Sequence, residues 1–90
     1  MGPPKLEMSY FVYVISGNRN SKLTTYVGHT NNLKKRLSLH NSGKGAKFTR
    51  GNLWKIIYSE KYDTKNEAIS REYYIKKNRK FRNLIKKTFK

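Results

Sequence analysis

Glu72 is the acidic side chain least easily explained as part of an ordinary surface. The chain has only five Asp and Glu residues. Four of them fall in the N-terminal segment, at a strand end or at the start of a helix, namely Glu7, Glu60, Asp63 and Glu67. Glu60 at its strand end is expected to be solvated. Glu72 remains, and at helical spacing it shares a face with Ala68 and Ile75.

A carboxylate on an apolar face costs several kcal/mol unless it is paired or bound to a cation. One explanation of Glu72 is an ion pair with one of the many Lys and Arg side chains, which the composition favours. The other is a hard-cation ligand, because Mg²⁺ often takes only one or two protein carboxylates together with phosphate and water. One available carboxylate fits a one-metal site better than a two-metal site.

Arg36 and His40 are four residues apart, which places them on one face of a helix. The planar guanidinium of Arg36 could bind two phosphate oxygens at once, and His40 could donate to the same group or move a proton. The alternative is that both residues form an ordinary helix border.

Tyr13 and Tyr26 lie on two segments with strand character. A buried tyrosine usually fills the core and has its hydroxyl satisfied. A free phenol has a pKa of about 10 and is a poor base at neutral pH. Nearby cations favour the ionised phenolate, and this chain has cations in excess.

Gly28 and the glycine-rich segment 42–52 are candidates for contact with a ligand backbone. Gly28 ends the second predicted strand, where a Cβ could obstruct an approaching chain; otherwise it simply terminates the strand. Lys47 and Arg50 suit phosphate contact, although both would also be ordinary in a solvated loop.

The hydrophobic pattern predicts the elements that position these side chains. Aromatic and β-branched runs predict three strands, over 9–15, 23–28 and 53–58. Apolar spacing and capping residues predict three helices, over 30–41, 65–78 and 80–90. This order predicts an α/β fold, a small sandwich with a three-stranded, mostly antiparallel sheet flanked by helices.

Three local details accompany this prediction. Both faces of strand 9–15 are apolar, so the strand should be covered on both sides. The first helix should be capped by Thr30 or Asn31. The last helix should be basic and amphipathic, with three side chains facing inward: Phe81, Leu84 and Ile85.

Charge and composition narrow the class of protein. The 90 residues carry 21 Lys and Arg, a net charge of +16, and no Cys. A polyanionic partner explains that surplus most simply, with nucleic acid the first candidate and an anionic membrane surface the second. No apolar run is long enough to span a membrane, so a soluble, cytoplasmic protein is expected. Residues 1–8 are interpreted as a disordered leader or cloning remnant before a single domain over 9–90.

The motifs occur in an order that resembles the GIY-YIG nuclease superfamily. The segments 11–15 (FVYVI) and 26–28 (YVG) resemble its paired signature, with Val in place of the first Ile. The segment 32–37 (NLKKRL) resembles the helix that bears the family's Arg, and 71–77 (REYYIKK) its metal-binding helix. The resemblance covers residues 9 to about 80. It is closest to small single-domain bacterial members, which are related to the N-terminal nuclease domain of the excinuclease.

The resemblance implies a metal-dependent phosphodiesterase acting on DNA, with one Mg²⁺ or Mn²⁺ ion. Tyr13 and Tyr26 would be the motif tyrosines, one of them the general base or the group that orients the attacking water. Arg36 would neutralise charge on the scissile phosphate. His40 would hydrogen-bond the phosphate or assist proton transfer, and Glu72 would hold the cation.

Two positions depart from the family pattern. His29 follows the YVG motif where the excinuclease branch has a Lys. Phe48 stands where many small members have a Tyr. Asn83 is the nearest match to a polar Asn on the last helix that assists the site in some branches. Gly28, His29, Lys47, Arg50 and Asn83 complete the expected DNA-binding set.

The sequence therefore predicts an endodeoxyribonuclease with low or structure-based specificity, acting on duplex or branched DNA. The chain has no room for a separate DNA-binding module, so a protein partner or a homodimer could supply specificity. Repair, recombination and mobile-element roles all stay open. The competing function is a non-catalytic nucleic-acid-binding module on the same fold. A membrane-surface function would rest on the last basic helix alone.

Overall fold

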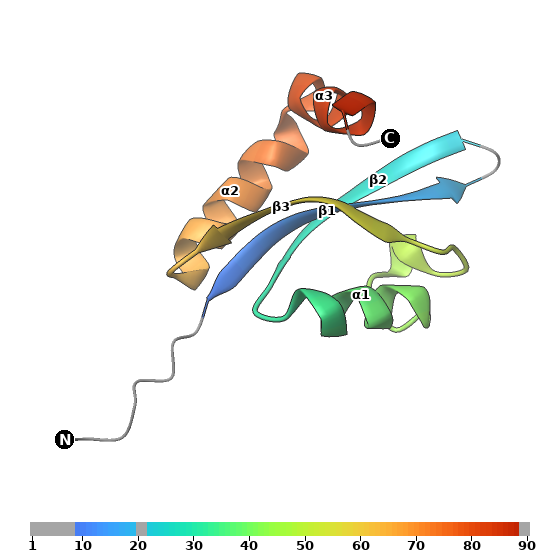
Figure 1. Cartoon of the computed structure of the whole chain (residues 1–90), viewed down its shortest axis with the longest axis horizontal. Coiled ribbons are helices and arrows are strands. Elements are labelled where there is room, and N and C mark those ends of the chain that lie inside the picture. The colour runs from blue at the N-terminus through green and yellow to red at the C-terminus, as the bar shows by residue number, and fades with distance from the viewer. Residues whose placement is uncertain (1–8, 20–21, 89–90) are drawn as a thin grey trace.

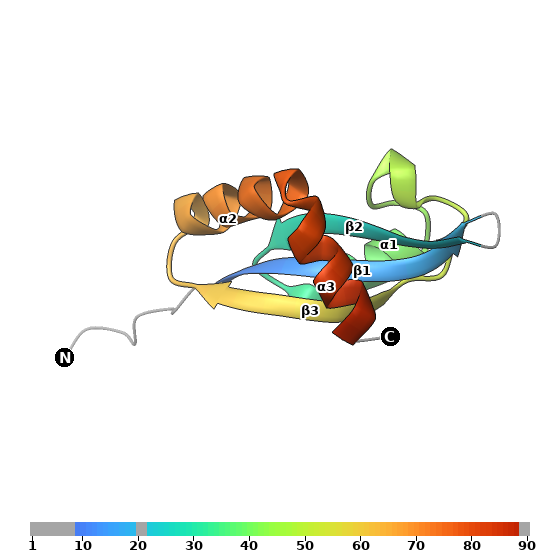
Figure 2. The same cartoon turned by 90° about the horizontal axis from the view of Figure 1, so that it is seen from above.

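The computed structural model describes residues 9–19 and 22–88. Its elements are β1 (Tyr10–Arg19), β2 (Lys22–Thr30), α1 (Leu33–Asn41), the 3₁₀ turn η1 (Lys47–Thr49), β3 (Lys55–Tyr62), α2 (Lys65–Lys77) and α3 (Arg79–Thr88). Helices α2 and α3 cover one face of the sheet and α1 lies against the other (Figure 1). Figure 2 shows α2 and α3 on the near side of the sheet and α1 behind it. The predicted fold class is confirmed; the predicted leader, residues 1–8, lies outside the described residues.

β1 is the central strand of the sheet. The strand order is β2-β1-β3, and β1 pairs antiparallel with both neighbours. This position explains the two apolar faces of β1, because helices cover both sides of the sheet. Val12 and Val14 belong to the core cluster under α2 and α3, whereas Tyr13 and Ile15 belong to a second cluster with Trp54 on the α1 side.

The β1–β2 hairpin is longer than predicted. Its ladder continues from Ile15↔Tyr26 through Gly17↔Thr24 as far as Arg19↔Lys22, so most of the segment 16–22, which lies between the first two predicted strands, is paired strand. Backbone pairing propagates the ladder there without apolar side chains. Position 17 of this ladder requires a glycine, because a Cβ on Gly17 would lie 2.7 Å from the carbonyl oxygen of Leu53.

Helix α1 begins at Leu33, later than predicted. Its cap is Asn32, not Thr30 or Asn31, and the Asn32 side chain accepts a hydrogen bond from the backbone N–H of Lys35 at 3.1 Å. Thr30 Oγ1 instead accepts from the Asn32 N–H at 3.1 Å, closing the turn ahead of the helix. Helix α2 is capped by Thr64, whose Oγ1 accepts from the Glu67 N–H at 3.2 Å.

Helix α3 buries a narrower stripe than predicted. Ile85 is buried and Phe81 packs beside it, but Leu84 is 59% exposed. Each residue of a helix turns by about 100°, so Leu84 lies well to one side of the row formed by Phe81 and Ile85. Among the described residues, no helix combines the length and apolar character needed to cross a membrane.

Glu60 is not the solvated strand-end residue that the sequence predicts. Its side chain is 17% exposed and accepts hydrogen bonds from Arg71 Nε and Nη2 at 2.8 and 3.0 Å. The hydroxyls of Tyr62, at 2.6 Å, and Tyr58 donate to it as well. Burial alone would raise the pKa of Glu60, but the hydrogen bonds from Arg71 and the two tyrosines outweigh it and lower the pKa from 4.5 to about 2.

Candidate active site

Tyr13 is a core residue of β1 whose hydroxyl is aimed at α1. It is 2% exposed and lies opposite Gly28 in the antiparallel ladder. A Cβ on Gly28 would lie 2.4 Å from the Tyr13 hydroxyl and 2.6 Å from the carbon that carries it. Gly28 is thus a mid-strand residue rather than a strand terminator, and its missing side chain makes room for the Tyr13 phenol.

A chain of hydrogen bonds connects Tyr13 with the loop after α1. The Tyr13 hydroxyl lies 2.7 Å from His40 Nε2, and His40 Nδ1 lies 2.8 Å from Thr49 Oγ1. The Thr49 hydroxyl donates to the Ala46 carbonyl at 2.8 Å. Because that proton is used, His40 Nδ1 must carry the proton shared with Thr49, which assigns the tautomer. Nε2 of a neutral His40 is therefore the acceptor of the Tyr13 hydroxyl.

The electrostatics keep both members of this pair neutral. Burial lowers the pKa of His40, and the positive charge of Arg36 lowers it further. Burial also raises the pKa of Tyr13, against the opposing effect of the hydrogen bond from Arg36. A neutral phenol thus faces a neutral imidazole with a free lone pair, which is the arrangement required to move a proton from one to the other.

Arg36 approaches the same hydroxyl from α1. Its Nε donates to the Tyr13 hydroxyl at 3.3 Å, so Arg36 and His40 both contact this one oxygen from the helix face that they were predicted to share. The hydrogen bond with Tyr13 raises the pKa of Arg36 and keeps its charge. Arg36 is partly exposed and also lines a small hollow of about 180 Å³ beside the start of α1.

Tyr26 lies between this cluster and α2. Its ring meets the His40 ring edge-on, with centroids 5.1 Å apart, and stacks on Phe48 at 6.2 Å. The ammonium of Lys76, on α2, lies 5.9 Å from the Tyr26 centroid. Because β2 is an edge strand, Tyr26 is in reach of residues from both faces of the sheet.

Glu72 is held on α2 by two basic side chains. Its Oε1 lies 2.6 Å from His29 Nδ1, and its Oε2 lies 2.9 Å from Lys76 Nζ. The Glu72 side chain is 17% exposed. The apolar face predicted for this helix is present, because Ala68 and Ile75 are fully buried. Both explanations of Glu72 thus remain open, since a paired carboxylate with residual exposure can still bind a cation.

Three features of the site agree with a single family. They are a buried tyrosine on β1, a YVG segment on the paired strand β2, and a helix, α1, that bears an Arg. The family model for the GIY-YIG catalytic domain matches residues 9–86. The chain belongs to the GIY-YIG family. It is thereby a domain of a nuclease family that acts on DNA and generally uses a divalent metal ion.

Several relatives of this GIY-YIG domain are small proteins as well. A UPF0213 protein of Bacillus licheniformis is 50% identical over 70 residues, which cover 77% of this chain and 69% of the relative. One from Clostridium perfringens is 50% identical over 68 residues, covering 74% and 70%. One from Oceanobacillus iheyensis is 39% identical over 80 residues, covering 88% and 90%. No solved structure matches the chain significantly.

The metal-ligating side chains of this GIY-YIG domain suit a single hard cation such as Mg²⁺. Among the described residues, no group of three or more His, Asp and Glu side chains could enclose a metal ion. Glu72 offers a carboxylate whose charge acts on Tyr13, and Mg²⁺ accepts a single carboxylate when phosphate oxygens and water complete its coordination. His29 and Lys76, which hold Glu72, would then orient the ligand rather than add to it.

The remaining expected DNA-binding residues lie in three places. Lys47 and Arg50 are exposed at the two ends of the η1 segment, on either side of Thr49, so they flank the His40 hydrogen bond. His29 lies against Glu72. Asn83 lies on α3 in a polar hollow of about 290 Å³ that Arg82 and other residues of α3 and β2 line.

Two residues of the GIY-YIG site were missed in the sequence. Thr49 is fully buried and fixes the tautomer of His40. Gly45 makes room for the same ring, because a Cβ there would lie 2.5 Å from His40 Nδ1. Both belong to the segment 42–52, and its three Gly residues close to a Thr are a signal that could have marked a close contact.

Asn41 anchors the end of this segment. Its side-chain oxygen accepts from the Trp54 N–H at 2.6 Å, and its amide donates to the Trp54 carbonyl at 3.1 Å. The Trp54 indole in turn donates to the Thr49 carbonyl at 2.8 Å. The loop that supplies Thr49 is therefore fixed by side-chain hydrogen bonds to its backbone.

Proposed function

We propose that this GIY-YIG domain is a metal-dependent endonuclease that hydrolyses DNA phosphodiester bonds by a one-metal, tyrosine-assisted mechanism. The observation that carries the proposal is the Tyr13 hydroxyl, held 2.7 Å from Nε2 of His40 and 3.3 Å from Nε of Arg36. A tyrosine that only filled the core would not need its hydroxyl to contact both a base and a fixed cation.

Substrate binding would use the cations around this hydroxyl. Arg36 would bind the scissile phosphate through its guanidinium, which remains charged. Lys47 and Arg50, exposed on the adjoining loop, would contact flanking phosphates. These contacts fix the phosphate against Tyr13, which supplies the orientation on which hydrolysis depends.

The proton path follows from the hydrogen bonds. As the attacking water forms its bond to phosphorus, its proton passes to the Tyr13 oxygen while the Tyr13 proton moves to His40 Nε2. The phosphorus–oxygen bond to the leaving strand breaks, and the leaving oxygen takes a proton from solvent. Tyr26, in contact with the His40 ring, would help orient the water. The His40 proton is then lost to solvent, which restores the site.

Glu72 would hold one Mg²⁺ or Mn²⁺ ion, which supplies positive charge to stabilise the developing negative charge on the phosphate and leaving oxygens. The protein's contribution is to fix the carboxylate. His29 and Lys76 do so from both sides, at 2.6 and 2.9 Å.

A specific observation favours the competing function, a non-catalytic nucleic-acid-binding module. In the structure both oxygens of Glu72 face basic side chains of the same chain. If His29 and Lys76 neutralised Glu72 on DNA in place of a metal ion, the positive surface alone would hold the nucleic acid. Specificity would be low or structure-based in either case, unless a protein partner or a homodimer supplies it.

The deciding experiment is cleavage of plasmid and branched DNA with Mg²⁺ or Mn²⁺. EDTA, Glu72→Ala and Glu72→Gln are the comparisons, and Glu67→Gln, on an exposed face of the same helix, is the matched control. Cleavage that Glu67→Gln retains and the other three abolish supports the nuclease. Salt-dependent binding with no cleavage under any condition supports the binding module.

A further inference from the structure

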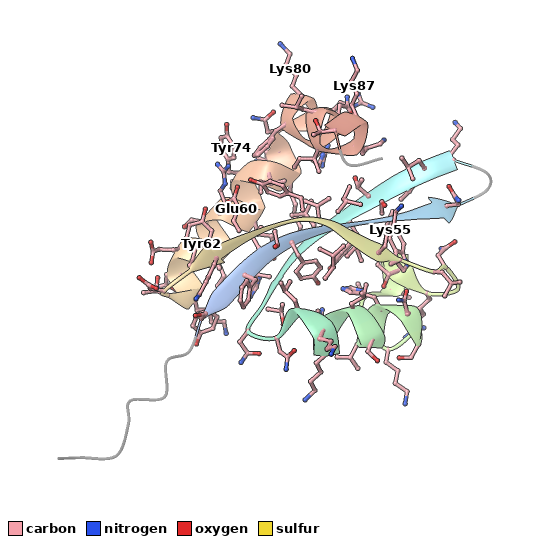
Figure 3. The ribbon with its side chains drawn as sticks, in the orientation of Figure 1. Lys55, Glu60, Tyr62, Tyr74, Lys80 and Lys87 are labelled. Atoms are coloured by element: carbon pink, nitrogen blue, oxygen red, sulfur yellow. The ribbon has the colours of Figure 1, made fainter. Side chains whose placement is uncertain are left out.

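The outer side of α2 and the start of α3 carry two exposed tyrosines among cations. Tyr73 is 60% exposed and Tyr74 is 49% exposed. They line a hollow of about 510 Å³ together with Lys77, Asn78, Arg79 and Lys80. None of these described lining residues is acidic. Figure 3 shows Tyr74 on α2 and Lys80 extending from α3 away from the sheet.

The Tyr74 ring is held in place by its neighbours. The guanidinium of Arg71 lies 4.8 Å from its centroid, and the Asn78 amide donates to its hydroxyl at 3.0 Å. Phe81 meets the ring edge-on at 6.4 Å. Arg71 is itself fixed by its two hydrogen bonds to Glu60. A ring that is already ordered loses little side-chain entropy when a ligand stacks on it.

Tyr73 adds a second aromatic ring with its own cation. The ammonium of Lys77 lies 4.6 Å from the Tyr73 centroid. Exposed aromatic rings beside Lys and Arg are the combination that binds single-stranded nucleic acid, because every base has a face that can stack and every nucleotide carries a phosphate. Duplex DNA would use the cations but not the rings, since its bases are stacked on one another.

The exposed surface on α2 and α3 extends towards the edge strand β2. Arg79 lines this hollow and also the polar hollow beside Thr24 and Thr25. Thr25 is the neighbour of Tyr26 on β2. Tyr26 packs on the α1 side of the sheet and Thr25 on the side of α2 and α3, so a DNA strand leaving the active site would cross the edge strand β2 and meet the cations of α3 before the exposed tyrosines.

Charge argues against a second copy of the chain as the occupant. Each copy carries a net charge of +16, and an interface here would bring the cations of one copy against those of the other. A polyanion relieves that repulsion and releases counterions as it binds.

We propose that Tyr73 and Tyr74 form a stacking surface for unpaired nucleotides of a DNA substrate, with the phosphates held by Lys77, Arg79 and Lys80. The inference rests on the proposed function in taking DNA as the nucleic acid. It gives the domain a structural preference, for DNA that has a single-stranded tail or branch beside a duplex.

Fluorescence anisotropy in EDTA tests the proposal without cleavage. The probes are a duplex with an unpaired tail of about ten nucleotides, within the span that such surfaces cover, and a blunt duplex of equal total charge. The unaltered chain is expected to bind the tailed DNA at least about fivefold more tightly. The double variant Tyr73→Ala/Tyr74→Ala should lose that preference. Tyr73→Phe/Tyr74→Phe should keep it, and Ile69→Ala, another exposed apolar residue of α2, is the matched control.

Four outcomes would overturn the proposal: no preference for the tail in the unaltered chain, equal loss in the phenylalanine variant, tighter binding of an RNA tail, or a dimer that the alanine variant dissociates. Circular dichroism of the alanine variant checks that it folds.

Plasmid nicking with Mg²⁺ separates this proposal from the proposed nuclease activity. A chain that prefers tails but never nicks contradicts the nuclease alone, whereas one that nicks but shows no preference contradicts the stacking surface alone.

Discussion

The Tyr13 hydroxyl lies 2.7 Å from His40 Nε2, although the two residues are 27 positions apart in the chain. One side chain comes from the central strand and the other from the last turn of α1. Since burial keeps the His40 ring neutral and Thr49 receives its Nδ1 proton, the contact has one direction, from the Tyr13 hydroxyl to the imidazole. This directed pair is what most of the following predictions test.

Tyr13→Phe removes the proton that His40 accepts while it keeps the ring. The single-turnover rate of DNA cleavage should fall by about 10²- to 10⁴-fold, the usual contribution of general acid–base catalysis. The free energy of unfolding should fall by about 1–3 kcal/mol, because His40 Nε2 is left buried without a partner. Tyr73→Phe, an exposed residue on α2, is the control. A Tyr13→Phe variant that cleaves at the rate of the unaltered chain would remove Tyr13 from the mechanism.

Thr49→Val tests whether the second nitrogen of His40 sets the tautomer. The change nearly preserves shape but leaves the Nδ1 proton without its acceptor at 2.8 Å, so the Nε2-protonated tautomer, which cannot accept from Tyr13, becomes competitive. The cleavage rate should fall at least about tenfold, and Thr49→Ser should restore it because the hydroxyl returns. ¹⁵N chemical shifts of the His40 ring report the tautomer directly. An unchanged tautomer in Thr49→Val would contradict this positioning role.

Gly28→Ala tests the close approach between the strands. The new Cβ would lie 2.4 Å from the Tyr13 hydroxyl, so either the phenol or the strand must move. We expect a loss of about 1–3 kcal/mol in urea unfolding, the usual cost of overpacking, together with a large loss of cleavage. Gly43→Asn is the control, because nothing lies within 4 Å of a Cβ there and Asn tolerates the positive φ of 79°. Equal stability of the two variants would show that the clash is relieved without cost.

The pH dependence of cleavage should reflect the lowered pKa of His40. The ring is the base only when it is neutral, so cleavage is full above its pKa and is lost as the pH falls through it. Burial and Arg36 place that pKa below 6.5, and the acid limb of the single-turnover rate should accordingly lie below pH 6.5. Arg36→Gln removes the positive charge that lowers the pKa of His40, so the acid limb should move to higher pH. An acid limb above pH 6.5 in the unaltered chain would contradict the assignment of His40 as the base.

Those parts of the fold and site that depend on local sequence pattern could be predicted from the sequence. Alternation along β1 predicted its two covered faces, and the four-residue spacing of Arg36 and His40 predicted their shared side of α1. The contacts that depend on how helices and strands pack against one another could not be predicted in this way. Thr49 becomes a buried acceptor only once Asn41 has fixed the loop through Trp54.

Glu60 shows the same limit, because its partner Arg71 is on another element. A lone Glu at the end of an exposed-edge strand predicts a solvated side chain. Only the packing of α2 against the sheet brings Arg71 to it, eleven residues along the chain. Likewise, the role of Gly28 could not be distinguished from strand termination until the register with Tyr13 was known.

Glu60→Gln should destabilise the fold in a manner that depends on pH. The substitution keeps the shape but removes the charge that Arg71, Tyr58 and Tyr62 stabilise, so the free energy of unfolding at neutral pH should fall by about 1–3 kcal/mol. The pKa of Glu60 is about 2 in the folded chain against 4.5 ordinarily. The unfolded chain therefore binds more protons between these values, and the stabilisation is complete above pH 4.5 and lost as the pH falls towards 2.

Urea unfolding at a series of pH values between these limits measures the effect. The difference between the unaltered chain and Glu60→Gln should shrink steadily as the pH falls from 4.5. Asp63→Asn, which removes an exposed carboxylate three residues further along, should show a much smaller difference at neutral pH. Because Arg71 also lies over the Tyr74 ring, Glu60→Gln should in addition weaken binding of tailed DNA. A constant difference between the two proteins across this pH range would show that the carboxylate of Glu60 is not held in its charged form by Arg71.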